Sequence, residues 1–113
     1  MNDDLSLPAL QRRYHQLCQQ LAQTGWISEG YVQDRGPGAG GPCYQWTRKV
    51  RAKTVSVALS KEQYAWLKCA IENWRATQVV IKEMQKISRH VLFATVPNPR
   101  RRKRLGKKVL GLI

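Results

Sequence analysis

The sequence predicts an α+β fold: an N-terminal helix, a small antiparallel β-hairpin or three-stranded sheet, a long C-terminal helix and a disordered basic tail. Apolar residues recur every three or four positions near the N-terminus and again after residue 60, as on one face of a helix. Between these stretches, two runs rich in aromatic and β-branched residues alternate in polarity, as strands do. A chain of 113 residues holds one modest core. We therefore expect a single domain over residues 1–94 and a flexible basic arm over residues 95–113.

The first helix is predicted from its apolar face and from the residues at its two ends. Ser6 can cap the helix, and Pro8 suits its first turn. Gly25 is expected to close it in a left-handed conformation. The apolar face consists of Leu10, Tyr14, Leu17 and Leu21.

A short strand or extended segment is predicted next, followed by a loop and a hairpin. The extended segment covers Trp26, Ile27, Tyr31 and Val32. Residues 35–42 contain four glycines and two prolines, so we expect an irregular loop there. The hairpin strands are predicted at residues 44–50 and 54–59, separated by the polar tract of residues 51–53. Alternation places Tyr44 and Trp46 on one face of the first strand.

A long helix is predicted from Ser60 to about Leu92. Ser60 and Gln63 form a capping-box pattern, in which each side chain can bond to the other residue's backbone amide. A span of about 45 Å exceeds what a compact domain of this size needs. Either the first helix packs along it, forming an intramolecular hairpin, or two chains pair through it. The near-heptad set is Tyr64, Leu67, Ile71, Trp74, Ile81, Met84 and either Ile87 or Ser88, and a second, apolar set is Trp66, Cys69, Val79 and Val80.

The charge of the chain is strongly and unevenly positive. Twenty Lys and Arg against seven Asp and Glu leave a net charge of +13. Such an excess repels itself and indicates a polyanionic partner. Two other interpretations are a solubilising surface with a loose tail and attraction to an anionic membrane surface. The last acidic residue is Glu83, and seven cations fall between residues 100 and 108.

Residues suited to catalysis are sparse. His15 and His90 lie on different predicted helices without an acidic residue three or four positions away, so surface positions are expected. Cys18, Cys43 and Cys69 are isolated, with Cys43 expected to be the most exposed. The glycine tract lacks the spacing of a phosphate-binding loop. We predict no enzymatic activity, no cofactor and no metal site.

The candidate nucleic-acid-binding residues form a basic tip and a basic arm. The basic tip lies at the turn of the predicted hairpin, a ribbon of the width that can enter a major groove, although a solvated turn would look the same. The basic arm can follow phosphates or enter a minor groove. Tyr44 and Trp46 could stack on bases or belong to the core. The tip comprises Arg48, Lys49, Arg51 and Lys53, and the arm comprises Arg100, Arg101, Arg102, Lys103, Arg104, Lys107 and Lys108.

One set of motifs resembles a family of small basic prokaryotic proteins whose genes often lie beside transposase genes. The resemblance rests on a GPYY-like strand at residues 41–44, a GKT-like turn at residues 51–54 and an IEN helix segment at residues 71–73. It covers about Leu7 to Leu92 and omits the arm. Cys43 departs from the usual aromatic residue, and no cysteine cluster precedes the strand. The resemblance implies a mobile-element setting.

These observations predict a nucleic-acid-binding accessory protein of a mobile element, which grips phosphates of duplex DNA through the tip and the arm. RNA binding would use the same cations. The alternative is a protein-interaction subunit of a transposase, nuclease or ribonucleoprotein complex, which pairs through the long helix with a partner or a second copy. No apolar run is long enough for a membrane span, no secretory signal is recognisable, and unpaired cysteines favour a reducing compartment, so a cytoplasmic location is expected.

Overall fold

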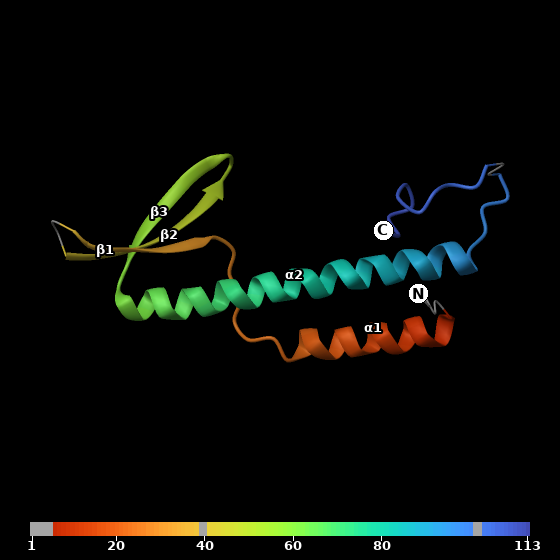
Figure 1. Cartoon of the computed structure of the whole chain (residues 1–113), viewed down its shortest axis with the longest axis horizontal. Coiled ribbons are helices and arrows are strands. Elements are labelled where there is room, and N and C mark those ends of the chain that lie inside the picture. The colour runs from red at the N-terminus through yellow and green to blue at the C-terminus, as the bar shows by residue number, and fades with distance from the viewer. Residues whose placement is uncertain (1–5, 39–40, 101–102) are drawn as a thin grey trace. The chain divides into compact units, whose positions relative to one another are not determined.

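The computed structural model describes residues 6–38, 41–100 and 103–113. In these residues, helix α1 is followed by strands β1, β2 and β3 and by the long helix α2, which confirms the predicted α+β fold (Figure 1). The chain divides into two compact units. The helical unit comprises residues 1–23 and 78–113, and the sheet unit comprises residues 24–77. Helix α2 (Lys61–Thr95) contributes residues to both.

Helix α1 (Leu7–Ala22) begins as predicted and ends earlier than predicted. The Ala9 amide donates to the Ser6 hydroxyl at 3.3 Å, and Pro8 lies in the first turn. The helix ends at Ala22, and its C-cap Gln23 has φ −100°. Gly25 does not have a positive φ, so the predicted left-handed closure there was wrong. Its lack of a side chain serves close approach instead, since a Cβ would lie 3.1 Å from the Asn73 amide nitrogen.

The core of the helical unit lies between α1 and the second half of α2. Leu10, Leu17 and Ile87 are buried there, with Leu17 only 1% exposed. Tyr14, Val80, Met84 and Val91 are packed around them. The predicted packing of α1 along α2 within one chain is therefore confirmed, and additional pairing of two chains stays a prediction.

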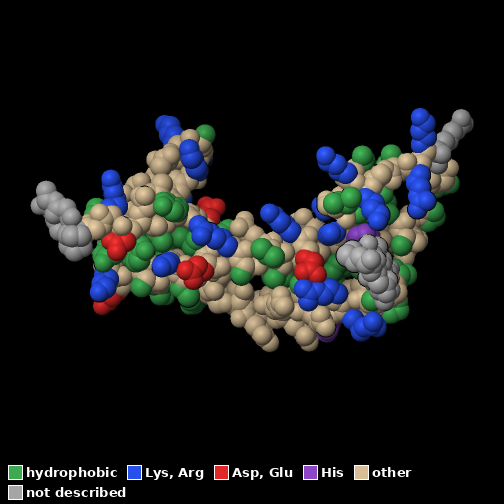
Figure 2. Space-filling view, in the orientation of Figure 1, with side chains coloured by type: hydrophobic (Ala, Val, Ile, Leu, Met, Phe, Trp, Pro, Cys, Tyr) green, Lys and Arg blue, Asp and Glu red, His purple; other side chains and the backbone are tan. Residues whose placement is uncertain are grey.

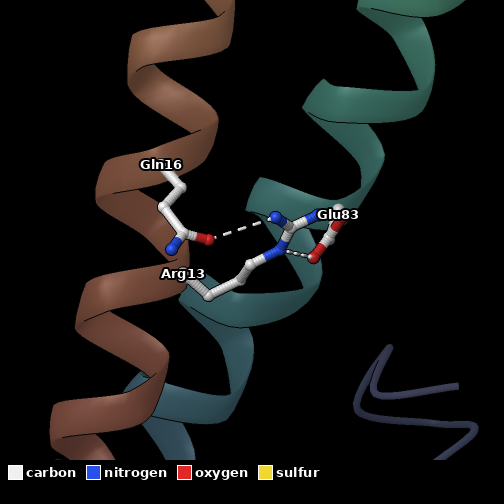
Figure 3. Close-up of polar contacts among 3 residues, drawn as sticks. All are labelled: Arg13, Gln16 and Glu83. Atoms are coloured by element: carbon white, nitrogen blue, oxygen red, sulfur yellow. Dashed lines mark hydrogen bonds and ion pairs between the residues drawn. The ribbon is translucent and has the colours of Figure 1, made fainter.

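An ion pair at the surface also ties α1 to α2. The Arg13 guanidinium donates to both carboxylate oxygens of Glu83, at 2.6 and 2.9 Å, and to the Gln16 side-chain oxygen (Figure 3). The hydrogen bond and positive charge of Arg13 hold the pKa of Glu83 below its usual value of 4.5. Both side chains remain more than a third exposed, so solvent screens the pair and its contribution to stability is small.

This ion pair predicts a pH-dependent effect of Glu83→Gln. Folding lowers the pKa of Glu83. The stabilisation of the folded state by the ion pair is therefore complete above the usual pKa of 4.5, and it disappears as the pH falls through the lower pKa that Glu83 has in the folded state. Thermal unfolding should therefore show the variant slightly less stable than the wild type at neutral pH, with the gap closing in acid. A gap that is constant with pH would mean that the carboxylate charge is not its cause.

The described C-terminal residues form a helical turn beside the end of α2. The Leu112 amide donates to the Lys107 carbonyl at 2.9 Å, and Gly111 has φ +73°. The Arg89 guanidinium donates to the Gly111 carbonyl at 3.3 Å, and a Cβ at Gly111 would lie 2.8 Å from the Arg89 Cδ atom. The apolar end of the chain, for which the sequence indicates no partner, therefore lies against α2, with Leu110 and Leu112 half-buried.

The sheet unit contains an antiparallel sheet in the order β1-β2-β3. Strand β1 covers Tyr31–Gly38, β2 covers Gly41–Val50 and β3 covers Lys53–Leu59. Residues 39–40 of the predicted irregular loop over residues 35–42 lie outside the described residues. For the rest of that range the prediction was wrong, because β1 ends at Gly38, β2 begins at Gly41, and Pro37 and Gly38 pair with Pro42 and Gly41. The register shifts between Asp34 and Pro37, where Gly36 has φ +73° and its amide donates to the Asp34 carboxylate. A bulge with a left-handed glycine accommodates the tract within the sheet.

One face of the sheet packs on the beginning of α2. Tyr44 contacts Tyr64 with ring centroids 4.9 Å apart, and the Trp46 indole donates to the Glu29 carbonyl at 3.1 Å. The other face is polar and carries a hydrogen bond between Thr47 and Ser56. The predicted assignment of faces is thus confirmed by the register. The capping box is confirmed as well, because the Ser60 and Gln63 amides are bonded reciprocally to each other's side chains, at 2.9 and 3.1 Å.

Candidate nucleic-acid interface

The basic tip lies at the free end of the β2–β3 hairpin, away from the first turns of α2 (Figure 1). Lys49, Arg51 and Lys53 are exposed there, and Lys and Arg side chains gather at this end of the hairpin (Figure 2). Strand alternation separates the charges. Lys53 shares the helix-facing side of the sheet with Arg48, whereas Lys49 lies on the polar side and Arg51 lies in the turn. The tip therefore presents cations in several directions, which suits phosphates on two sides of a groove.

Arg48 differs from the other cations of the tip because its side chain packs on the protein. Its guanidinium carbon lies 4.7 Å from the centroid of the Trp46 ring, a cation–π contact. Its Nε atom is buried and has no hydrogen-bond partner among the described residues. Arg48 thus covers the Trp46 ring as well as carrying charge, so a loss of binding on its substitution would have two possible causes.

The turn of the hairpin holds two residues in a strained conformation. Arg51 and Ala52 have φ +49° and +66°, as a two-residue type I′ turn requires. Neither is a glycine or an asparagine, and left-handed geometry costs about 1–2 kcal/mol per residue for such side chains. The strain leaves a cation at the outermost position of the ribbon, where a glycine or asparagine would form the same turn more easily. Strain of this kind at an exposed cation supports a binding role.

The basic arm belongs to the helical unit, whereas the basic tip belongs to the sheet unit. Arg100, Lys103, Arg104, Lys107 and Lys108 are exposed, and Arg101 and Arg102 lie outside the described residues. Lys103, Arg104 and Lys107 line an open hollow of about 820 Å³. Apolar side chains that include Phe93 and Leu105 also line it, together with His90 and Asn98. The described cations of the arm are therefore available to a ligand.

Two exposed tryptophans at the sheet unit were not recognised from the sequence. Tyr44 and Trp46 are half-buried, as the core interpretation predicts, whereas Trp26 and Trp66 are 75% and 55% exposed. Their ring centroids lie 6.4 Å apart with an interplanar angle of 34°. The sequence offered one signal for this surface: Trp66 belongs to the second apolar set of the long helix and not to its near-heptad face. Their contact could not be read locally, because forty residues separate them.

The described residues gather little that could perform chemistry. Cys69 is exposed and Cys43 is half-buried, so the expectation that Cys43 is the most exposed cysteine was wrong. His15 is exposed and His90 is half-buried. In the part of the chain that the structure describes, no group of three or more His, Cys, Asp or Glu residues could hold a metal ion. No described helix has the length and apolarity that crossing a bilayer requires.

Electrostatics favour an anionic ligand for both units. The segments of the helical unit carry twelve Lys and Arg against three acidic residues, and the sheet unit carries eight against four. Glu83 neutralises Arg13, whereas no ion pair is formed by the described cations of the tip or the arm. Comparisons with protein families, curated proteins and solved structures find no match to this chain.

Proposed function

We propose that this protein binds nucleic acid without strong sequence preference, through phosphate contacts made by the basic tip and the basic arm. Duplex DNA is the proposed ligand, because β2 and β3 extend as a two-stranded ribbon beyond Thr47, the last residue of β2 that pairs with β1. A ribbon of this width can enter the major groove, and this one would carry Lys49, Arg51 and Lys53 into it. The proposal includes a setting in a mobile element, which rests only on the resemblance in sequence. The supporting observation is the strained, exposed cationic turn at the free end of the ribbon.

Salt dependence tests this proposal. Each neutralised phosphate releases condensed counterions, so log K falls linearly with log salt concentration, with a slope of about −0.9 per contact on B-DNA. If the tip and the arm together neutralise about six phosphates, the slope should be about −5. Fluorescence anisotropy with a labelled duplex over a range of salt concentrations measures it.

Three outcomes would contradict the proposal. A slope between about zero and −1 on duplex DNA and on structured RNA would exclude phosphate binding by these cations. A comparable slope on RNA with much weaker binding to DNA would instead identify RNA as the ligand. Isolation from cells in a protein complex that survives high salt, without bound nucleic acid, would favour the protein-interaction alternative.

A further inference from the structure

The tryptophan pair, Trp26 and Trp66, leaves large aromatic surfaces open to solvent within the sheet unit. Trp26 is 75% exposed and Trp66 is 55% exposed, although their rings are neighbours. Aromatic side chains usually contribute to stability by burying 150–250 Å² each. A single exposed apolar residue is ordinary, whereas an exposed aromatic cluster marks an interaction surface.

The position of Trp26 is fixed by hydrogen bonds on both sides of it. The Asn73 side-chain amide donates to the Trp26 carbonyl at 2.9 Å, and the Ser28 amide donates to the Ala70 carbonyl at 3.2 Å. Just before it, the hydroxyls of Thr24 and Thr77 are 3.2 Å apart. The segment is therefore attached to α2 although it is neither helix nor strand. Because these hydrogen bonds hold the backbone in place, the exposed ring is preorganised for binding, which lowers the entropic cost of contacting a ligand.

An apolar hollow continues from Trp66 toward the sheet. The hollow, of about 480 Å³, lies between the helix-facing side of the sheet and the first turns of α2. Figure 2 shows hydrophobic side chains gathered there. Trp46, Val57, Leu59, Trp66 and Leu67 line it together with the polar side chains Glu62 and Gln63.

Cations extend along the same face of the sheet. Arg48 follows Trp46 on that face of β2, and Lys53 lies four residues from Val57 on β3, about 13 Å along the strand. The apolar surface thus meets positive charge in the direction of the tip, whereas Glu62 is the one anionic residue in the lining of the hollow. Aromatic faces that continue into a cationic strand form the pattern of single-strand binding surfaces, in which bases stack and phosphates meet Lys or Arg.

We propose that the tryptophan pair stacks on unpaired nucleobases, with the adjoining phosphates directed toward Arg48 and Lys53. This inference rests on the proposed nucleic-acid binding. It adds that the ligand contains unpaired nucleotides, in a single-stranded stretch or at a frayed duplex end, which phosphate contacts alone would not require. Stacking accepts every base, because each has a π-face, so it agrees with binding that tolerates sequence.

The test compares an aromatic and an aliphatic replacement of both tryptophans. Trp26→Phe/Trp66→Phe keeps rings that can stack, whereas Trp26→Leu/Trp66→Leu keeps apolar bulk and removes them. Fluorescence anisotropy should show that the leucine variant binds labelled oligothymidylate about tenfold more weakly or worse, while the phenylalanine variant stays near the wild type. Both should bind a blunt duplex as the wild type does, with an unchanged salt slope, since no phosphate contact is removed.

A control and a second readout keep the result interpretable. Val79→Ala removes another exposed apolar side chain, in the helical unit. It should change neither the affinity for oligothymidylate nor the affinity for the blunt duplex. Thermal unfolding of each variant shows whether the fold is retained. If the leucine variant misfolds, quenching of tryptophan fluorescence in the wild type by oligothymidylate provides the test, because stacking on exposed indoles should quench it. Absence of quenching at saturation would then overturn the inference.

Other outcomes separate this inference from the proposed function. Equal single-strand affinity of the leucine variant and the wild type would overturn the stacking inference and leave phosphate binding intact. A wild-type dimer that becomes monomeric in the leucine variant, with single-strand affinity unchanged, would assign the pair to contact between two copies. Loss of salt-dependent binding to every nucleic acid would overturn both proposals.

Discussion

The triple substitution Lys49→Ala/Arg51→Ala/Lys53→Ala is expected to weaken duplex binding by about two to three orders of magnitude at about 0.1 M salt. These three cations are exposed and lie at or beside the β2–β3 turn. If each meets one phosphate, removing them should also make the salt slope shallower by about three, from about −5 to about −2. The arm, which belongs to the other unit, should account for the remaining slope. Anisotropy titrations of the variant and the wild type at several salt concentrations measure both quantities.

Arg48 is left unchanged in this variant so that packing and charge are not confused. Its guanidinium covers the Trp46 ring, and its loss would expose that ring as well as remove a cation. The matched control is Lys61→Ala/Lys68→Ala/Arg75→Ala, which removes three exposed cations from the same unit on α2. An equal loss of affinity in the two triple variants would mean that binding follows net charge, and the tip would not be a site.

A second control separates the charge of the turn from its conformation. Ala52→Gly keeps every cation and relieves the left-handed strain at φ +66°. It should raise thermal stability slightly, because relief of strain exceeds the greater backbone entropy of glycine in the unfolded chain. Duplex affinity should stay the same. A marked loss would show that the conformation of the turn, and not only its charge, contributes to binding.

Local signals in the sequence predicted much of the fold. The capping box involves two residues three positions apart, so its hydrogen bonds can be inferred without tertiary information. Strand alternation similarly assigned Tyr44 and Trp46 to the packed face. The glycines and prolines of residues 35–42 favour irregular structure, whereas in the described part of that range the pairing of β1 with β2 and a bulge at Gly36 overcome that preference.

Tertiary contacts determined what the sequence did not show about the site. The four cations of the tip lie within six positions of one another, but Arg48 packs on the ring of Trp46, two positions before it in β2, whereas the other three are exposed. Trp26 becomes part of a surface only because Asn73 and Ala70, more than forty residues away, bond its segment to α2. No local pattern encodes such a contact. The sequence therefore identified the charges of the candidate site and missed the aromatic surface beside them.

Leu17→Ala is expected to be the most damaging single substitution in the helical unit. Leu17 is 1% exposed and lies in the core that α1 forms with Ile87 of α2. Replacing a leucine in such a position costs about 2.7–5 kcal/mol, from lost burial and the cavity left behind. Since the total stability of a small protein is about 5–15 kcal/mol, this is a large fraction. Denaturant unfolding followed by circular dichroism measures it, with Gln19→Ala on an exposed position of α1 as the control.

The fate of α1 in this variant follows from its length. A helix of 16 residues is marginal in water without tertiary packing, so weakening its contact with α2 should lower helicity before the sheet unit unfolds. The apolar face of α2 around Ile87 and Met84 would then lose its cover, which favours association of two chains through α2. Sedimentation should show this association in Leu17→Ala and not in Gln19→Ala. A cost below about 1 kcal/mol with unchanged helicity would mean that α1 is not held by this core.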